Sequence, residues 1–285
     1  MTLAATLAET LERALGSRPR DATSAPSAGV VELCDGRRVF VKSPRDRRAQ
    51  AMVDAEEHGL AFLRGRSALR VPRVLARGAD FLVLEALDMR PLDHARASAE
   101  SFGRALADLH RSGAPSFGLD RDNFIGLTEQ RNTPHARWAD FYRDERILAV
   151  AKRCDFDADT RALVDTVAER MNDLVGDEEP PSRLHGDLWS GNACADAQGT
   201  PCVFDPAVSG GSRELDLAMM RLFGGFSRRT FDAYEESFPL LPGHESRVAL
   251  YQLYFLLVHV AIFGEGYVAQ TDRCLRTILR SMDMI

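Results

Sequence analysis

The sequence of 285 residues predicts an α+β protein with two lobes, a small strand-rich lobe over residues 1–87 and a larger helical lobe over residues 88–285. The first part contains short β-branched and aromatic runs between turn residues, which is typical of paired strands. The second part carries apolar residues at helical spacing. The length is sufficient for two lobes, and we expect the boundary near residues 85–91.

Six elements are expected in the first lobe. Leucines recur every fourth residue from Leu3 to Leu15 and are followed by Gly16, which predicts an amphipathic helix with a glycine cap. An Asp-Gly turn then joins a hairpin over residues 30–33 and 38–42. A helix over residues 47–64 and strands over residues 73–76 and 81–86 complete the lobe.

The second lobe is expected to be mostly helical. Ser98 is a suitable N-cap for a helix that ends near His110. Other helices are predicted over residues 138–148, 158–175, 213–223 and 246–263. The run from residue 248 to residue 264 has no formal charge, but it contains Gln252 and His259 and is shorter than a membrane span. We therefore interpret it as a buried helix and expect no membrane partner.

The most informative motif spans residues 185–192 and continues at residues 203–206. Asp187 and Asn192 are five residues apart, and Asp205 follows Asn192 by thirteen residues after an apolar run. This is the acidic spacing of a kinase-type phosphoryl-transfer site, in which the first Asp orients the acceptor hydroxyl and the Asn and second Asp hold Mg²⁺ against the ATP phosphates. Mg²⁺ requires such hard oxygen ligands.

Lys42 is a second, independent indication of the same chemistry. The chain has 36 Lys and Arg residues, of which only Lys42 and Lys152 are lysines. Lys42 ends the predicted strand over residues 38–42, where kinases place a lysine that binds the α and β phosphates. A compact ammonium fits there and a planar guanidinium does not. A surface lysine is the alternative for such a residue taken alone.

Composition excludes some classes of function. The net charge of −6 argues against a nucleic-acid partner, which would require a basic surface. Up to Glu85 the chain has 14 basic and 11 acidic residues, and beyond it 22 basic and 31 acidic ones; the acidic second part suits a metal and cationic substrates. The five cysteines have no zinc-type spacing and are expected to be reduced thiols of a cytoplasmic protein.

With these motifs in place, the sequence resembles the fructosamine (ketosamine) 3-kinases, a branch of the aminoglycoside-phosphotransferase-like proteins within the protein-kinase-like fold. The similar segments are spread over most of the chain. They are residues 40–42, 56–60, 117–119, 122–126, 185–192, 205–207, 213–219 and 222–226, together with Gln130, Asn132, Trp138 and apolar and aromatic positions between Tyr251 and Gly264.

The resemblance implies ATP-dependent phosphorylation of the sugar 3-hydroxyl of a free or protein-bound ketosamine, which is a deglycation (repair) activity. It implies that Asp187 is the catalytic base, that Asn192 and Asp205 are the Mg²⁺ ligands, and that Lys42 contacts the ATP phosphates. Glu56 is implied as the ion-pair partner of Lys42, with Glu57 as the nearest alternative.

Other residues are assigned less directly. Trp189, His259, Asn123 and Asn132 are candidate substrate contacts. For Trp189 the alternative is plain packing, for the two amides it is local hydrogen bonding, and for His259 it is a place in the core. His185 and Asp216 are expected to support the catalytic loop, because buried polar groups near such a loop must find partners.

The sequence also departs from the family pattern. No clear glycine-rich loop precedes Lys42, so the phosphate-covering residues are not predicted; Ser24 and Ser27 are candidates. A redox role for Cys34 is not predicted either. Two alternative functions stay open: an aminoglycoside or amino-alcohol (choline-type) kinase, and a catalytically silent nucleotide-binding module. The substrate's sugar and amine and the oligomeric state are not predicted.

The Lys42 interpretation predicts that Lys42→Arg lowers the rate of phosphoryl transfer at least about tenfold, equivalent to ~1.4 kcal/mol in the barrier. The reason is that the substitution keeps the charge and loses the compact ammonium. Steady-state kinetics with ATP would measure this effect. Turnover at the wild-type rate would identify Lys42 as a surface residue.

Overall fold

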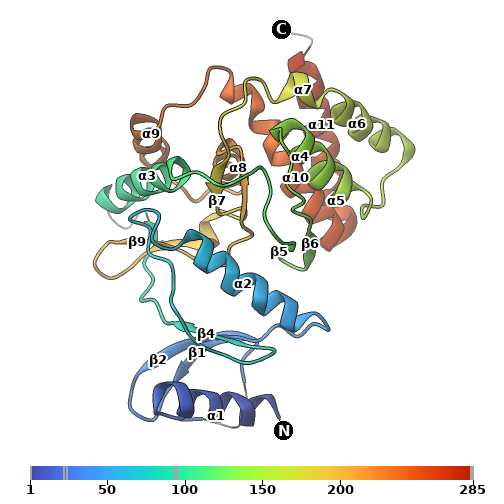
Figure 1. The fold of residues 1–285 in the computed structure, drawn as a ribbon. Coiled ribbons are helices and arrows are strands. Elements are labelled where there is room, and N and C mark those ends of the chain that lie inside the picture. Colours follow the sequence, from blue (N-terminus) through green and yellow to red (C-terminus); the bar gives the residue numbers. More distant parts are fainter. Residues whose placement is uncertain (1, 22, 24, 93–95, 283–285) are drawn as a thin grey trace.

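The computed structural model describes the whole chain except residues 1, 22, 24, 93–95 and 283–285, and it has two lobes (Figure 1). The amino terminus lies in the small lobe, and the carboxyl terminus lies at the far end of the large lobe. The small lobe is built on one sheet, and the large lobe is mainly helical. The predicted α+β class is therefore confirmed.

An antiparallel sheet with the strand order β1-β2-β4-β3 forms the small lobe. Its strands are β1 (Ala28–Glu32), β2 (Arg38–Lys42), β3 (Val74–Arg77) and β4 (Leu82–Glu85). Val39 and Val41 point to the helix α1 (Leu3–Leu15), whose leucines pack on that face. Because side chains alternate along a strand, Phe40 and Lys42 point to the opposite face, toward the large lobe. This alternation directs Lys42 to the site.

Helix α2 (Ala49–Leu63) lies on the inner face of the sheet, between the two lobes (Figure 1). Its buried residues share a core with β4 and with residues of the large lobe. At Gly59 the helix approaches the large lobe so closely that an added Cβ would lie 3.0 Å from Cγ of Pro206. The helix therefore rests directly against the chain that follows Asp205.

The large lobe contains the remaining helices. They are α3 (Arg96–Arg111), α4 (Trp138–Phe141), the π-helical turn Tyr142–Leu148, α5 (Ala149–Ala151), α6 (Ala158–Glu169), α7 (Met171–Leu174), α8 (Glu214–Leu222), α9 (Arg228–Ser237), α10 (His244–Phe263), the 3₁₀ turn Gly264–Tyr267 and α11 (Val268–Met282). Short antiparallel strand pairs lie among them in the described part of the chain. Two are hairpins: β5 (Asn123–Ile125) with β6 (Thr128–Gln130), and β8 (Ala193–Ala195) with β9 (Pro201–Val203). The third pairs β7 (Ser182–Leu184) with β10 (Ser209–Gly211), which follows the β8–β9 hairpin in the chain.

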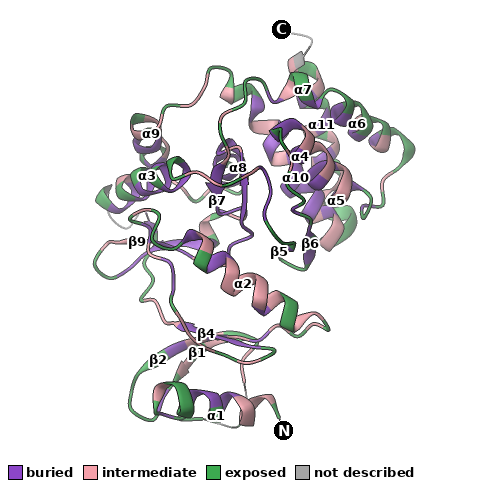
Figure 2. Cartoon of the chain, viewed as in Figure 1, coloured by how far each residue is buried: buried purple, intermediate pink, exposed green. Residues whose placement is uncertain are grey.

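Helix α10 is the centre of the large lobe. Its residues are buried on nearly all sides, and Figure 2 shows buried residues concentrated on α10, α8 and β7. Among the described residues, one helical stretch (244–281) is long and apolar enough to cross a membrane, and half of its most apolar window is buried inside the structure. The predicted buried helix is confirmed in this position.

Several elements differ from the sequence predictions. The helix expected over residues 158–175 is divided into α6 and α7 at Arg170, whose ψ of 10° departs from helical geometry. Helices α9 and α11 were not predicted. The three-residue strands of the large lobe are too short for alternation to reveal them. The partners β7 and β10 are also far apart in the chain, so only the folded structure defines their pairing.

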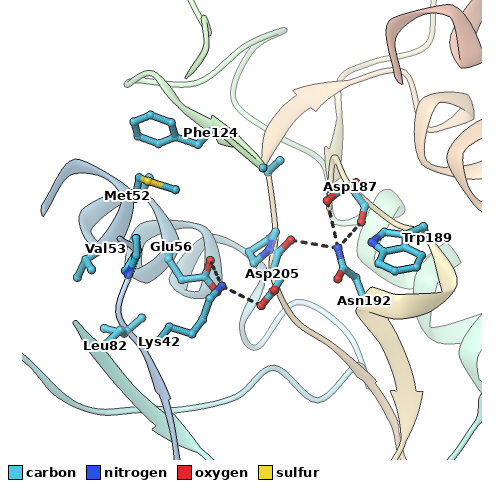
Figure 3. A pocket seen from close by; sticks show the side chains of 15 residues that line it. Lys42, Met52, Val53, Glu56, Leu82, Phe124, Asp187, Trp189, Asn192 and Asp205 are labelled. Atoms are coloured by element: carbon cyan, nitrogen blue, oxygen red, sulfur yellow. Dashed lines mark hydrogen bonds and ion pairs between the residues drawn. The ribbon is translucent and has the colours of Figure 1, made fainter. Parts of the chain in front are cut away.

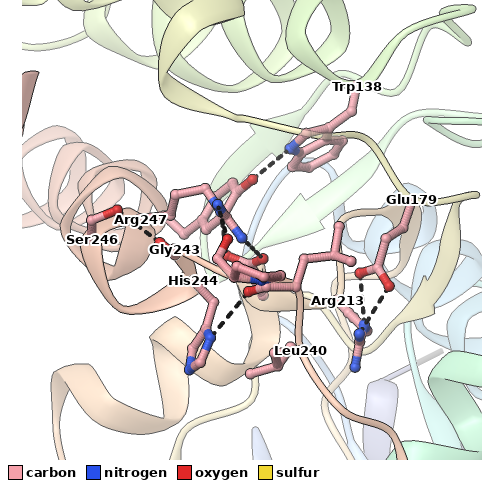
Figure 4. A network of polar contacts seen from close by, with 12 residues as sticks. Trp138, Glu179, Arg213, Leu240, Gly243, His244, Ser246 and Arg247 are labelled. Carbon is pink, nitrogen blue, oxygen red and sulfur yellow. Dashed lines mark hydrogen bonds and ion pairs between the residues drawn. The ribbon is translucent and has the colours of Figure 1, made fainter. Parts of the chain in front are cut away.

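Two buried ion pairs fasten the ends of α8 and α10 (Figure 4). Arg247 donates to Glu214 at 2.7 and 2.9 Å. Arg213 donates to Glu179 at 2.8 Å and to the carbonyls of Phe238 and Pro239 at 2.6 Å. Each guanidinium is thereby compensated by a carboxylate in a largely buried position, as burial of charge requires.

We expect Glu214→Ala to lower the free energy of unfolding by about 3 kcal/mol, because it leaves the Arg247 guanidinium buried without its carboxylate. Urea denaturation would measure this change. Asp272→Ala is the control, since Asp272 pairs with Arg276 on the exposed face of α11 and should contribute less than about 0.5 kcal/mol. Equal effects of the two substitutions would contradict a structural role for the buried pair.

Candidate active site

Three elements bring Lys42, Glu56 and Asp205 together between the lobes (Figure 3). Nζ of Lys42 lies 2.9 Å from a carboxylate oxygen of Glu56, on α2, and 2.9 Å from one of Asp205. Burial disfavours the ammonium, but the two carboxylates outweigh it and raise the pKa of Lys42. Glu57 lies 2.6 Å from Arg77 instead, so the partner of Lys42 is Glu56.

The loop over residues 185–192 connects β7 to β8 and is held from below by Asp216. The backbone N–H groups of His185 and Gly186 each donate to Asp216 at 2.8 Å, and Nε2 of His110 lies 3.2 Å from the same carboxylate. Gly186 has φ of 82°, and an added Cβ would lie 1.9 Å from the carbonyl oxygen of Ala207. Only glycine fits this close crossing of two chain segments.

His185 has an internal place rather than one in the cavity. It is fully buried, and its Nε2 donates to the carbonyl of Phe204 at 3.0 Å. Its Nδ1 accepts from the N–H of Asp187 at 3.3 Å. Burial lowers the pKa of His185, which favours the neutral ring that this pattern of one donor and one acceptor requires.

Asp187 and Asn192 face the same space as Asp205. The amide of Asn192 donates to the backbone carbonyl of Asp187 at 2.9 Å and to its carboxylate at 3.2 Å. Burial, and then the carboxylate of Asp205, raise the pKa of Asp187 to about 7. Asp205 has φ of 56°, the only positive value of a non-glycine residue in the described part of the chain. This conformation is strained for a side chain other than glycine and is typical of functional sites.

The set of oxygens suits a magnesium ion. Asp205 provides a carboxylate and Asn192 an amide oxygen, and Mg²⁺ binds one or two carboxylates together with phosphates and water. Burial is the main cause of the raised pKa of Asp187, and the nearby carboxylate of Asp205 adds repulsion to it. A divalent cation would relieve this repulsion, so the residues present fit the ion.

The two lobes enclose a pocket of about 280 Å³ around these side chains (Figure 3). Its walls include Met52 and Val53 of α2, Phe124 of β5 and the indole of Trp189. A second, apolar pocket of about 120 Å³ lies beside it and ends at Asp205. Most of its lining residues come from the sheet and from the connection after β4: Val30, Phe40, Leu84, Glu85, Leu87 and Met89. Pro72, before β3, and Phe204, after β9, complete the wall.

A third pocket, of about 480 Å³, opens on the other side of Asp187. It shares Gly126, Asp187 and Trp189 with the first pocket. Its outer part is an aromatic cleft formed by Phe223 after α8, His259 and Phe263 of α10, and Tyr267. Asp187 therefore stands between a polar pocket and an aromatic one.

The candidate substrate residues are placed differently from one another. Trp189 is 41 % exposed and lines the first and third pockets, and His259 lines the third. Asn123 and Asn132 are buried, and the expected sugar contact is not supported for either. Asn123 donates to the carbonyl of Val208 at 2.8 Å, and Asn132 donates to Asn123 at 2.9 Å. Their amides stabilise the loops around β5 and β6.

Ser24 and Ser27, the candidates for covering the phosphates, and Cys34 remain to be placed. Ser24 lies outside the described residues. Ser27 precedes β1 and is exposed. Cys34 is an exposed free thiol beside the β1–β2 turn, and its Sγ lies 3.8 Å from the carbonyl of Pro19.

Sequence reasoning missed the walls of the pockets. Met52 and Val53 were placed on a helix but not in a site, and Phe223, Phe263 and Tyr267 were not identified as a cleft. The available signal was a large aromatic residue, Phe263, directly before Gly264, at the end of an otherwise apolar helix. Its meaning depends on Phe223, which is distant in sequence.

Comparison with known proteins agrees with this geometry. The family model described as fructosamine kinase matches residues 6–281. The chain belongs to this family. The "Probable ketoamine kinase" proteins of Vibrio parahaemolyticus and Synechocystis are 36 % and 38 % identical, over 86 % and 87 % of this chain and 86 % and 85 % of their own lengths.

Solved structures support the same assignment. The crystal structure of a "putative fructosamine-3-kinase" from Thermobifida fusca has a TM-score of 0.86 and 38 % identity, and the match covers 98 % of this chain and 99 % of that one. A choline kinase of Streptococcus pneumoniae, at 13 % identity and a TM-score of 0.67 over 97 % and 98 % of the chains, shares the fold alone. As a fructosamine kinase family member, the protein is an ATP-dependent phosphotransferase, and the two-lobed kinase-like fold is confirmed.

The contacts of Asp216 predict that Asp216→Asn lowers the free energy of unfolding by about 2 kcal/mol, because an amide NH₂ would face backbone N–H donors that lose their acceptor. We also expect a fall in kcat, since the loop that carries Asp187 loses its anchor. Urea denaturation and steady-state kinetics would measure both. Wild-type values of stability and kcat would show that the loop is held by other contacts.

Proposed function

We propose that the protein transfers the γ-phosphoryl group of ATP to the 3-hydroxyl of the sugar in a ketosamine, free or attached to a protein, and thereby takes part in deglycation. The observation that carries this proposal is the position of Asp187. Its carboxylate stands between a pocket suited to phosphates and a pocket large enough for a sugar and its amine. Membership of the fructosamine kinase family supports the substrate class.

The nucleotide has a consistent place in the two pockets on the side of Lys42. The apolar pocket between the sheet and Phe204 suits a purine base. The phosphates would then reach Lys42, which Glu56 and Asp205 keep charged and fixed. Asn192 and Asp205 would hold Mg²⁺, and the bound ion would neutralise charge on the phosphates.

On the other side, Asp187 would act on the acceptor. A sugar hydroxyl in the third pocket can donate to its carboxylate, which orients the oxygen for in-line attack and receives the proton as the new bond forms. Burial raises the pKa of Asp187, and a raised pKa makes its carboxylate a stronger acceptor for the proton of the hydroxyl. The amide of Asn192 fixes the carboxylate at 3.2 Å.

The proposal is tested with purified protein, ATP and Mg²⁺ on fructosyl-lysine, ribulosyl-lysine, an aminoglycoside and choline. We expect transfer to the ketosamines, with the phosphate on O3 by NMR. Asp187→Asn should abolish transfer while ATP binding is retained, because the side chain keeps its shape and loses the acceptor charge. Asp205→Ala should abolish turnover and weaken the effect of Mg²⁺ on nucleotide affinity.

The matched control is Asp80→Asn, an exposed aspartate in the turn before β4, which should leave turnover unchanged. Transfer to choline or the aminoglycoside with none to the ketosamines would assign a different acceptor. Transfer to no acceptor, with nucleotide bound, would favour a silent binding module. Full activity of Asp187→Asn would remove Asp187 from the mechanism.

A further inference from the structure

The aromatic cleft beside Asp187 has a closely packed set of rings. The ring centroid of His259 lies 4.9 Å from that of Phe223, 4.8 Å from that of Tyr267 and 5.6 Å from that of Phe263. Phe263 and Tyr267 are themselves 6.0 Å apart. Rings contributed by the residue after α8, by α10 and by the turn after α10 thus surround one opening, next to the residue that would orient the acceptor hydroxyl.

These rings are unusually accessible. Phe263 is 63 % exposed, Phe223 is 40 % exposed and Trp189 is 41 % exposed, although most large apolar residues that the structure describes are buried. Large aromatic side chains exposed together, around a cavity, mark a surface that binds something. The pocket volume of about 480 Å³ leaves room for more than the sugar.

Few polar side chains line this pocket, and the formal charge among them is negative. Asp187 is the only acidic or cationic residue in its lining within the described chain, apart from the titratable His259. Nδ1 of His259 donates to the carbonyl of Phe255 at 2.7 Å. In the neutral ring Nε2 is therefore an acceptor. Ring faces, a carboxylate and an acceptor nitrogen together suit a cation with apolar substituents.

We propose that the aromatic cleft binds the ammonium group and the carbon arm of the ketosamine, and that it selects amines whose nitrogen carries an uncharged alkyl arm over α-amino acids. This inference rests on the proposed function. In a ketosamine, C3, C2 and C1 are the only carbons between the 3-hydroxyl and the nitrogen. With the hydroxyl on Asp187, the nitrogen reaches the edge of the cleft and its substituent lies among the rings.

A ketosamine of an α-amino acid is disfavoured for a direct electrostatic reason. Its carboxylate is attached one carbon from the nitrogen, so it would lie against ring faces, which carry negative quadrupole charge. It would also approach Asp187, a like charge. No arginine or lysine lines this pocket among the described residues, so the carboxylate would lose water without gaining the positively charged partner that its burial requires.

The test compares three substrates with the same sugar: N-butyl fructosamine, fructosyl-glycine and fructosyl-glycinamide. The last two differ only in the carboxylate. We expect wild-type kcat/KM to be at least about tenfold higher for the butyl and glycinamide compounds than for fructosyl-glycine. Phe263→Ala should raise the KM for the butyl compound about tenfold and leave kcat and the KM for ATP within about twofold.

The matched control is Leu127→Ala. Leu127 is 57 % exposed, close to Phe263 in exposure, but lies outside the aromatic cleft, so its loss should leave all three substrates unchanged. Equal use of fructosyl-glycine and fructosyl-glycinamide, or equal effects of Phe263→Ala and Leu127→Ala, would overturn this inference and leave the proposed function intact. If no ketosamine is phosphorylated, the proposed function fails and this inference fails with it.

Discussion

The contact of Lys42 with both Glu56 and Asp205 is the interaction on which the site depends. It joins the sheet, helix α2 and the large lobe at a single nitrogen, with 2.9 Å to each carboxylate. An ammonium in such a buried position requires compensation, and the two acids provide it. The orientation of the lobes is therefore coupled to the charge balance of the cavity. The close approach of Gly59 to Pro206 makes the same connection through packing.

The backbone around the cavity is held in conformations that the surrounding structure has to stabilise. Asp205 has a positive φ, and Gly186 crosses beneath Ala207 where no side chain fits. Asp216 compensates by accepting two backbone N–H groups that would otherwise be unpaired in the core. The two aspartates therefore have different places. Asp187 lines the cavity, whereas Asp216 contacts the backbone of the loop that carries Asp187.

The two sides of Asp187 have contrasting chemistry. Toward Lys42 the cavity presents charged and amide groups suited to phosphates, and toward Phe223 and Phe263 it presents rings. Trp189 belongs to both sides, and its indole packs over Gly191, where an added Cβ would lie 2.2 Å from the ring. A glycine at this position lets the indole lie flat against the loop, which gives the two pockets a common wall.

The sequence by itself determined the local elements and the chemistry. Leucine spacing and Gly16 defined α1, an Asp-Gly turn defined the first hairpin, and the spacing of Asp187, Asn192 and Asp205 indicated phosphoryl transfer before any contact was known. These signals are local, because periodicity, turn conformations and motif spacing depend on residues that are near one another in the chain.

The tertiary structure alone decided which distant groups meet. On helix α2, Glu56 points toward Lys42 and Glu57 points toward Arg77, so Glu56 is the partner of Lys42. The tertiary structure also placed Asn123 and Asn132 in a buried network, and it assembled a cleft from Phe223 and Phe263. Sequence reasoning preferred Glu56 only through the family resemblance and kept Glu57 as an alternative. It could not derive these contacts, because adjacent residues on a helix point in different directions and packing between segments far apart in the chain sets the partner of each.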